Sequence, residues 1–458
     1  ADSDTVITQR DSEKATDKTI TVSTTDDATA NITIEDVNIN SYGDAIDVGS
    51  SSANITLEGD NKLNSEYGSG LHVSDGDVTI TGSGSLEAVS KNESNNNAAI
   101  GSHENEAMSG DITIGGDAQV TAVSRDDGAG IGSGDMGEMS GDITIGDNAQ
   151  VTAWSETGGA GIGSGRESNM SGNITIGGSA QVTAGSNSET AGIGSGNNGV
   201  FTSTGRVVIR DSAKVTAIGE NEGAGIGTGE DELMAGMIII QDNAQVTAIA
   251  GDRAAAIGSD NLDEMTGTII IIGNARVTTG ILDDDDVYFD YNTKEIKYTL
   301  DENAIGYIGD SKYSNHESDE GHYIIGPNVT INGISGSDIE ALKDYINVRL
   351  SGENHDGEPE NLTKLDVRSE NDEFTVTAEG EGAVEKILYG GSENVPTAPG
   401  TYPVTCVVRI GEETIEFQIG TYVVPEPAPR PEPMAYHTRI QLYRVADKQG
   451  RSIAYKAV

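Results

Sequence analysis

The chain has few of the residues that cross-link or fill an ordinary globular core. Its 458 residues include one cysteine, one tryptophan and four phenylalanines, against 60 glycines. A single cysteine excludes a disulfide framework. No apolar run reaches the roughly 18 residues that a membrane-spanning helix needs. We therefore expect no disulfide, no transmembrane segment and a core unlike that of a compact aromatic-rich domain.

Positive charge is also scarce. Lysine and arginine total 27 against 75 aspartates and glutamates, which gives a formal net charge of −48 at pH 7. Nucleic acids and anionic membranes are bound through clustered lysine and arginine, which this composition does not provide. The charge balance therefore predicts no nucleic-acid partner, and it favours solubility and divalent cations.

The chain does have a repeated phrase of about 31 residues. One copy comprises Asp-Ile-Thr-Ile at 142–145, Gln-Val-Thr-Ala at 150–153 and Ala-Gly-Ile-Gly-Ser-Gly at 160–165. The isoleucine of the third run recurs at near-constant spacing, at Ile100, Ile131, Ile162, Ile193, Ile226 and Ile257. A fixed period of this size is typical of stacked supersecondary units. Three short β-type runs per unit predict a solenoid with three strands per coil.

The first run of each unit can be followed along the chain. It starts at Ile32, Ile55, Val78, Ile112, Ile143, Ile174, Val207, Ile238, Ile269 and Val329. Alternate side chains of a strand point to opposite faces, so the outer pair of each run should point inward. The sequence thus predicts an all-β fold, a right-handed parallel β-helix of about ten coils over residues 1–335.

The pattern changes after the solenoid. Residues 336–424 contain spaced alternating runs that predict a small β-sandwich. Its phrase Pro399-Gly400-Thr401-Tyr402 resembles the entry to a late strand in bacterial immunoglobulin-like modules. Residues 425–458 are predicted to be a proline-rich linker and a basic tail, which could begin another module.

One outward position of the first run becomes apolar in three successive coils. The threonine of earlier coils is replaced by Val208, Ile239 and Ile270. Three stacked apolar side chains facing water would form an exposed patch, so we expect a cover. The first candidate is a hairpin formed by the insertion at about 280–302, and the second is the later β-domain.

Methionines recur four residues before the first run, at Met108, Met139, Met170, Met234 and Met265. A sulfur-rich metal or haem site would need histidines or cysteines of the same period, and none has it. We therefore predict a stacked interior ladder in which flexible thioethers fill a corner of the solenoid.

The outward side chains of the second run suggest a binding face. Glutamine and threonine should form parallel columns there, because stacked coils lie about 4.8 Å apart. Trp154 is added as a ring that could stack on a sugar. The candidate carbohydrate-binding residues are Gln119, Thr121, Gln150, Thr152, Trp154, Gln181, Thr183, Gln245 and Thr247.

Catalytic motifs are missing from the sequence. The Gly-His-Gly and Arg-x-Lys phrases of polygalacturonases do not occur, and no basic cluster suits a pectate lyase. The six histidines are scattered without metal-ligand spacing. We therefore predict no catalytic residue and no enzymatic activity.

Calcium is the one ion that the sequence suggests, because it takes oxygen ligands from acidic turns. The candidate metal ligands are Asp44, Asp47, Asp283 and Asp285. Solvated acidic turns without an ion are the alternative.

Two early phrases carry a resemblance to a known group. They are Gly43-Asp44-Ala45-Ile46-Asp47-Val48, followed by Asn-Ile-Thr-Leu at 54–57, and the run at 70–80. Both resemble the repeats of clostridial-type β-helix carbohydrate-binding proteins, and the later glycine-rich coils resemble surface repeats of Firmicutes. The resemblance implies a pectate-lyase-like right-handed fold, binding of plant polysaccharide without cleavage, and calcium at Asp44 and Asp47.

Together these patterns predict a non-catalytic extracellular polysaccharide-binding or adhesin protein, secreted or displayed on a bacterial cell surface. Its expected partner is a polysaccharide or a host or plant glycan. A structural spacer or self-assembling filament component is the first alternative, because flat ladders can also stack against another subunit. A polysaccharide lyase or glycosidase is the second alternative.

Overall fold

The computed structural model describes residues 5–25, 28–92, 94, 96–230, 233–259, 265–302, 304, 306–309, 321–342, 345–346, 362–370, 373–380, 382–410, 413–425, 442–446 and 452–457. The regular secondary structure of these residues is β-strand, apart from one short helix, α1 (Ile339–Leu342). Within them, no helix has the length and apolar character needed to cross a membrane.

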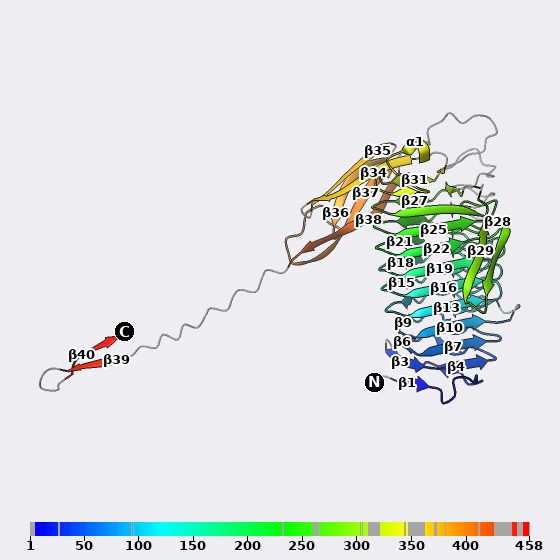
Figure 1. The fold of residues 1–458 in the computed structure, drawn as a ribbon, viewed down its shortest axis with the longest axis horizontal. Coiled ribbons are helices and arrows are strands. Elements are labelled where there is room, and N and C mark those ends of the chain that lie inside the picture. Colours follow the sequence, from blue (N-terminus) through cyan, green and yellow to red (C-terminus); the bar gives the residue numbers. More distant parts are fainter. Residues whose placement is uncertain are drawn as a thin grey trace.

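Three long sheets run up the molecule, with 13, 12 and 10 strands. Most strands of these sheets pair with the strand three places further along the chain, so the chain winds through all three sheets once per coil (Figure 1). Pairing between successive coils is parallel and in register; Val120 lies beside Val151, and Val151 beside Val182. This confirms the predicted parallel β-helix with three strands per coil.

The first sheet is built from β1 (Thr5–Thr8), β3 (Thr29–Glu35), β6 (Ser52–Glu58), β9 (Val78–Gly82), β12 (Ile112–Ile114), β15 (Ile143–Ile145), β18 (Asn173–Ile176), β21 (Arg206–Ile209), β24 (Met237–Ile240), β27 (Thr268–Ile271) and β31 (His322–Ile325), followed by two strands of the C-terminal module. The second contains β4 (Asn38–Ser41), β7 (Asp60–Ser65), β10 (Ser85–Ser90), β13 (Gln119–Ser124), β16 (Gln150–Ser155), β19 (Gln181–Ser186), β22 (Lys214–Ile218), β25 (Gln245–Ala250), β28 (Arg276–Asp290), β32 (Thr330–Ile331) and β33 (Ile334–Ser335), with β29 (Glu295–Leu300) attached to β28 as the twelfth strand. The third contains β2 (Ile20–Thr21), β5 (Ile46–Gly49), β8 (Leu71–Val73), β11 (Ile100–Gly101), β14 (Ile131–Gly132), β17 (Ile162–Gly163), β20 (Ile193–Gly194), β23 (Ile226–Gly227), β26 (Ile257–Gly258) and β30 (Ile308–Gly309).

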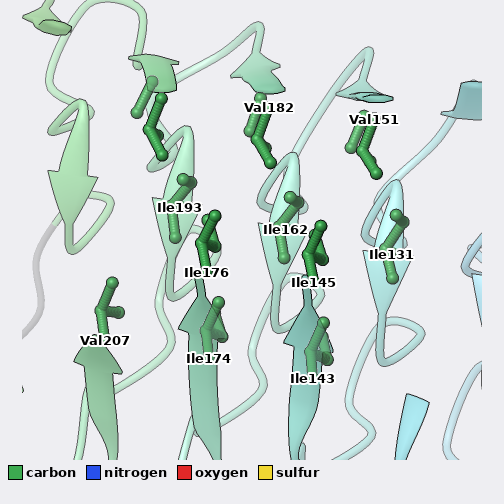
Figure 2. Packing of buried hydrophobic residues seen from close by; sticks show 14 of the residues in the cluster. Ile131, Ile143, Ile145, Val151, Ile162, Ile174, Ile176, Val182, Ile193 and Val207 are labelled. Atoms are coloured by element: carbon green, nitrogen blue, oxygen red, sulfur yellow. The ribbon is translucent and has the colours of Figure 1, made fainter. Parts of the chain in front are cut away.

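The core consists of columns of β-branched side chains that point into the solenoid. Ile143 and Ile145 stack on Ile174 and Ile176, and all four are fully buried (Figure 2). Each such side chain contributes about 1.5–3 kcal/mol when it is removed from water. Because every coil is covered by its neighbours, the chain needs few aromatic rings to build this core.

The predicted methionine ladder is present and is more regular than its sequence pattern. Isolated parallel bridges connect Met108, Met139, Met170, Phe201, Met234 and Met265 in that order, and all six side chains are fully buried. Phe201 fills the methionine position of its coil. The sequence pattern missed it because that coil is two residues longer than its neighbours and carries a different residue there.

The last coil differs from the predicted one. Residues 329–331 were expected to be a first-sheet strand, but β32 pairs with β28 in the second sheet. The first-sheet strand of that coil is β31, where Tyr323 lies beside Ile269. The insertion at 280–302 displaces the repeat, and Tyr323 stands where an aliphatic residue was expected. The strand β1 at the other end adds a coil that the pattern did not reveal.

The insertion forms the predicted hairpin, in which β28 turns back into β29 (Glu295–Leu300) with Phe289 opposite Ile296. The hairpin does not cover the apolar patch of Val208, Ile239 and Ile270, for which it was the first candidate. It packs instead on the outer face of the second sheet, over Val89, Val123, Trp154, Ile218 and Ile249. The reason is connectivity. Since β28 begins as a second-sheet strand, its continuation runs along that sheet (Figure 1).

The C-terminal module covers the apolar patch, as the second candidate predicted. It contains β34 (Leu362–Glu370), β35 (Glu373–Gly380), β36 (Gly382–Tyr389), β37 (Gly400–Ile410) and β38 (Glu413–Val424). Ile239 and Ile270 are buried in one cluster with side chains of this module, including Val404 and Phe417, and Val208 packs against the same cluster.

The module continues the solenoid rather than standing apart from it. Strand β34 pairs in parallel with β31 and antiparallel with β35, so both extend the first sheet. Strands β36, β37 and β38 form a separate three-stranded antiparallel sheet. These pairings do not show an immunoglobulin-like topology. In the tail, β39 (Leu442–Ala446) and β40 (Ser452–Ala457) pair as a hairpin, and residues 426–441 lie outside the described residues.

Candidate functional site

The predicted glutamine and threonine columns exist on the outer face of the second sheet. Gln119, Gln150 and Gln181 are direct neighbours on successive strands and are exposed. The threonine column runs beside them and is half-buried, with members Thr121, Thr152, Thr183, Thr216 and Thr247. Lys214 stands in the glutamine column between Gln181 and Gln245. The face therefore presents amides and hydroxyls at a fixed spacing of about 4.8 Å.

Trp154 does not lie on the open part of this face. It occupies the next outward position of β16 after Thr152, and the hairpin covers it, so the residue is only 1% exposed. The ring cannot serve as the open stacking platform that the sequence suggested. It lines a cleft between the hairpin and the second sheet instead.

This hairpin cleft has a volume of about 430 Å³. Small-molecule sites usually enclose about 300–1,000 Å³. The cleft is lined by Arg125, Asp126, Trp154, Glu156, Thr157, Asn187, Tyr288 and Phe289. Tyr288 is 53% exposed, so its ring is available to a ligand. The lining combines three aromatic residues, of which Tyr288 is the exposed one, with polar side chains that can hydrogen-bond.

Two buried donors of the cleft residues have no hydrogen-bond partner among the described residues. They are Arg125 Nε and Trp154 Nε1. A buried donor without a partner costs about 1–3 kcal/mol, so an acceptor supplied by a ligand or a water would recover that free energy. The Arg125 guanidinium lies 4.4 Å from the centroid of the Tyr291 ring, which holds the cation in place.

The other side of the cleft is fixed by the tip of the hairpin. The Tyr291 hydroxyl donates a hydrogen bond to the Glu156 carboxylate, and Lys294 pairs with Glu87. Burial, together with the Glu156 carboxylate, raises the pKa of Tyr291 well above its usual value, so the phenol stays protonated. These contacts join residues more than 100 positions apart. Sequence periodicity could not place them because the hairpin lies outside the repeat.

A second polar group lies at the first coils, on the side of the third sheet. Asp47 in β5 is the direct neighbour of His72 in β8, and His103 follows the next third-sheet strand, β11. The rings of His72 and His103 stack with centroids 3.8 Å apart and an interplanar angle of 3°. Asp44 and Glu106 complete this group, which we call the histidine cluster.

Each histidine nitrogen of the cluster lies near a carboxylate oxygen. His72 Nδ1 is 2.9 Å from Asp47 Oδ1, and His72 Nε2 is 2.7 Å from Glu106 Oε2. His103 Nε2 is 2.7 Å from Asp44 Oδ1, and His103 Nδ1 is 3.6 Å from Glu106 Oε2. The His72 side chain is only 9% exposed.

The electrostatics of the cluster favour charged groups. Burial by itself opposes ionisation of both Asp44 and His103, but their mutual hydrogen bond and charge attraction outweigh it. The net result is a lowered pKa for Asp44 and a raised pKa for His103. The backbone amide of Ser69 donates a further hydrogen bond of 2.7 Å to Asp44 Oδ1, which fixes that carboxylate.

Among the described residues, one group of three or more His, Cys, Asp or Glu side chains has ligand atoms close enough to hold a metal ion. It is Asp44, His72 and His103, with ligand atoms within 4.8 Å of one another. The structure thus brings the predicted Asp44 and Asp47 together, but with histidines that the sequence reading set aside. Asp283 is exposed on β28 and belongs to no such group, and the side chain of Asp285 lies outside the described residues.

The cluster does not suit the calcium ion that the resemblance implies. Calcium takes six to eight oxygen ligands, whereas this site presents two imidazoles. The sequence carried a signal that was missed, because His72 stands one coil after Asp47 at the same position of the repeat. The segment between β10 and β11 is longer than the one between β7 and β8. The sequence spacing therefore does not indicate that His103 lies beside His72.

No protein-family model, curated protein or solved structure matches this chain. The resemblance to clostridial-type β-helix proteins therefore stays a prediction from the motif residues. The function has to be inferred from the geometry of the face, the hairpin cleft and the histidine cluster.

Proposed function

We propose that this chain is a non-catalytic glycan-binding protein that is secreted or displayed on a bacterial cell surface. The observation that carries the proposal is the hairpin cleft, which adjoins the glutamine and threonine columns of the second sheet. A cleft next to a regular polar face is suited to a long, repetitive ligand, since one part of the polymer can enter the cleft while the rest follows the columns.

The residues of the cleft match the chemistry of a sugar. The exposed ring of Tyr288 can stack on the apolar face of a pyranose, and Asp126, Glu156 and Asn187 can accept or donate hydrogen bonds to its hydroxyl groups.

The columns add contacts without much entropic cost. Strand pairing in the solenoid fixes the backbone of every Gln and Thr in the ladder, so binding does not have to order a loop. Each contact is weak on its own, but many of them act along one chain of sugars. Linked weak contacts raise the overall affinity through a high effective concentration.

The experiment is binding of the intact protein to an array of plant and mucin-type glycans, followed by titration of the glycans that bind. Tyr288→Ala should weaken binding at least about tenfold, as expected for an exposed aromatic anchor. Tyr298→Ala is the matched control, because Tyr298 lies on the same hairpin, is 38% exposed and does not line the cleft.

The face is tested separately with the double variant Gln150→Glu and Thr152→Glu. Two carboxylates on the columns should repel an acidic glycan and remove amide contacts to a neutral one. If the double variant and Tyr288→Ala both bind as tightly as the parent chain, the proposal is wrong. Self-association of the pure protein in light scattering, without any glycan binding, would support the spacer or filament alternative instead.

A further inference from the structure

We propose that Asp44, His72 and His103, supported by Asp47 and Glu106, form a binding site for one divalent transition-metal ion of the zinc class. The site lies on the third-sheet side of the first coils, outside the hairpin cleft and the glutamine face. Its test is independent of whether the chain binds glycans.

The coil geometry positions the ligands before any ion arrives. Asp44 lies two residues before β5, His72 lies within β8 and His103 lies two residues after β11, so three successive coils each contribute one side chain. In-register stacking places the two imidazole rings face to face at 3.8 Å. Ligands held on paired strands are preorganised, which lowers the entropic cost of binding an ion.

The contact between His103 and Asp44 is short enough for a metal ion to take the place of the proton that they share. His103 Nε2 and Asp44 Oδ1 lie 2.7 Å apart, in direct hydrogen-bond contact. Zinc–ligand bonds of about 2.0–2.2 Å in a tetrahedron separate ligand atoms by roughly 3.3–3.5 Å. To admit the ion, Asp44 and His103 must separate by roughly 0.6–0.8 Å. The two stacked rings must also turn so that one nitrogen of each points at the ion. Asp44 is 17% and His103 32% exposed, so the site is open to solvent on one side.

The side chains around the proposed ligands make the contacts that usually support histidine in a metal site. Both nitrogens of His72 have a carboxylate partner, Asp47 on one side and Glu106 on the other. Whichever nitrogen binds the ion, the other keeps a carboxylate that orients the ring and raises its basicity. The Ser69 backbone amide orients the Asp44 carboxylate by a hydrogen bond to Oδ1. These carboxylates and the Ser69 amide are the contacts that would orient the ligands once the ion is bound.

Charge and ligand type select the class of ion. Metal binding requires both imidazoles to be neutral. The three carboxylates of Asp44, Asp47 and Glu106 then carry a charge of about −3, which a divalent cation largely compensates. Imidazole nitrogen with carboxylate oxygen suits zinc, copper, nickel and cobalt, whereas calcium and magnesium prefer oxygen alone. The affinity order of such sites should therefore place Zn²⁺ well above Ca²⁺.

The experiment uses the intact chain after removal of metal with a chelator. Calorimetric titration with Zn²⁺ should show one equivalent of binding, and Ca²⁺ at the same concentration should show none at this site. Titration with Co²⁺ should produce visible absorption bands typical of mixed nitrogen and oxygen ligands. Displacement of these bands by Zn²⁺ would show that both ions share one site.

Variants assign the ligands. His103→Gln should abolish stoichiometric Zn²⁺ binding, and Asp47→Asn should weaken it about 10- to 100-fold, as loss of a supporting carboxylate does at known zinc sites. His322→Gln is the matched control, because His322 lies in β31, far along the solenoid from the cluster. Far-UV circular dichroism checks that each variant keeps its fold.

Two results would overturn the proposal. One is a parent chain that binds less than one equivalent of Zn²⁺ and Co²⁺ at micromolar concentration. The other is Zn²⁺ binding that is equally tight in folded His103→Gln and Asp44→Asn. If His103→Gln fails to fold, Asp47→Asn and the Co²⁺ spectrum of the parent chain still decide the question, since each reports on the ligands without removing one of them.

Discussion

Gly132 shows how single residues set the distance between coils. Its φ of +141° belongs to the region that favours glycine, and a Cβ built on it would lie 1.7 Å from the carbonyl oxygen of Gly163 in the next coil. The third-sheet strands can pair because no side chain stands at this position. The repeated Ile-Gly of each unit is therefore a packing requirement of the sheet.

Gly132→Ala should therefore lower the free energy of unfolding by at least about 1–3 kcal/mol, from backbone strain and the clash with Gly163. Gly146→Ala is the control, because nothing lies within 4 Å of a Cβ built there. We expect the control to stay within about 1 kcal/mol of the parent chain. Thermal unfolding followed by circular dichroism measures both, and equal midpoints for the two variants would contradict this role of Gly132.

Cys406 is a buried hydrophobe rather than a reactive thiol. Its side chain is fully buried in the cluster of the C-terminal module, and burial raises its pKa to about 12. Because the thiol is neutral well above pH 8, it should not react with an aromatic disulfide reagent in the native protein at that pH. One equivalent should react after addition of denaturant. Rapid native labelling would show that the module opens or that the cluster is not packed.

Residue types with a regular period could be predicted well from the sequence. The inward Val and Ile columns, the glutamine and threonine columns and the methionine ladder all repeat once per coil, so one correct alignment places them all. The histidine cluster could not be found in this way. His72 and His103 occur once each, in coils of different length, and their approach depends on the register between those coils.

The hairpin is the element that turns a flat face into a cleft. Phe289 and Ile296 are 5% and 7% exposed and pack in one cluster with Trp154. Phe289→Asp would place a charge in this apolar contact, which costs several kcal/mol and should release the hairpin. Trp154 is the single tryptophan of the chain, so its fluorescence reports on the cover directly.

We expect Phe289→Asp to shift the emission of Trp154 to longer wavelength and to make it accessible to acrylamide, while the far-UV circular dichroism of the solenoid stays unchanged. Tyr298→Ser is the control on the same hairpin, since Tyr298 is 38% exposed. An unchanged emission spectrum in Phe289→Asp would mean that the hairpin does not shield Trp154 in solution.

The C-terminal module is held on the solenoid by the apolar patch of the first sheet. Earlier coils carry Thr at the positions of Ile239 and Ile270, so Thr is compatible with the strand itself. The double variant Ile239→Thr and Ile270→Thr should keep the coils but lose contact with the module, at a cost of about 1–2 kcal/mol per residue.

Hydrogen exchange measured by mass spectrometry tests this contact. The double variant should lose protection in β37 and β38 while protection in β12 and β15 stays as in the parent chain. Thr144→Ser, at the same position of an earlier coil, should leave both regions unchanged. Equal protection of β37 and β38 in parent and double variant would show that other contacts hold the module.

At the scale of elements, sequence reasoning succeeded where the period held and failed where it broke. It predicted the hairpin and the need for a cover over Ile239 and Ile270, but it ranked the hairpin above the C-terminal module, which is the cover. Which element covers which face depends on the sheet that each connection leaves, and this is set by β28 belonging to the second sheet and β34 to the first. The displaced period at β31 and β32 produced the other error.

The whole molecule combines a rigid solenoid with two features that do not repeat from coil to coil, the hairpin and the histidine cluster. Stacked coils fix the polar columns and the ligands of the histidine cluster, while the hairpin closes the cleft. The net charge of −48 keeps such a long surface soluble. In this account, binding of a polysaccharide requires no folding step, because both the face and the cleft exist before the ligand arrives.

The most direct test of the proposed function is a titration of the intact chain with pectin and mucin-type glycans while the fluorescence of Trp154 is recorded. The account predicts a saturable change in Trp154 emission with at least one of these glycans, and a curve shifted at least about tenfold to higher concentration in Tyr288→Ala. Tight glycan binding on the array that leaves Trp154 emission unchanged, and that Tyr288→Ala does not weaken, would contradict it.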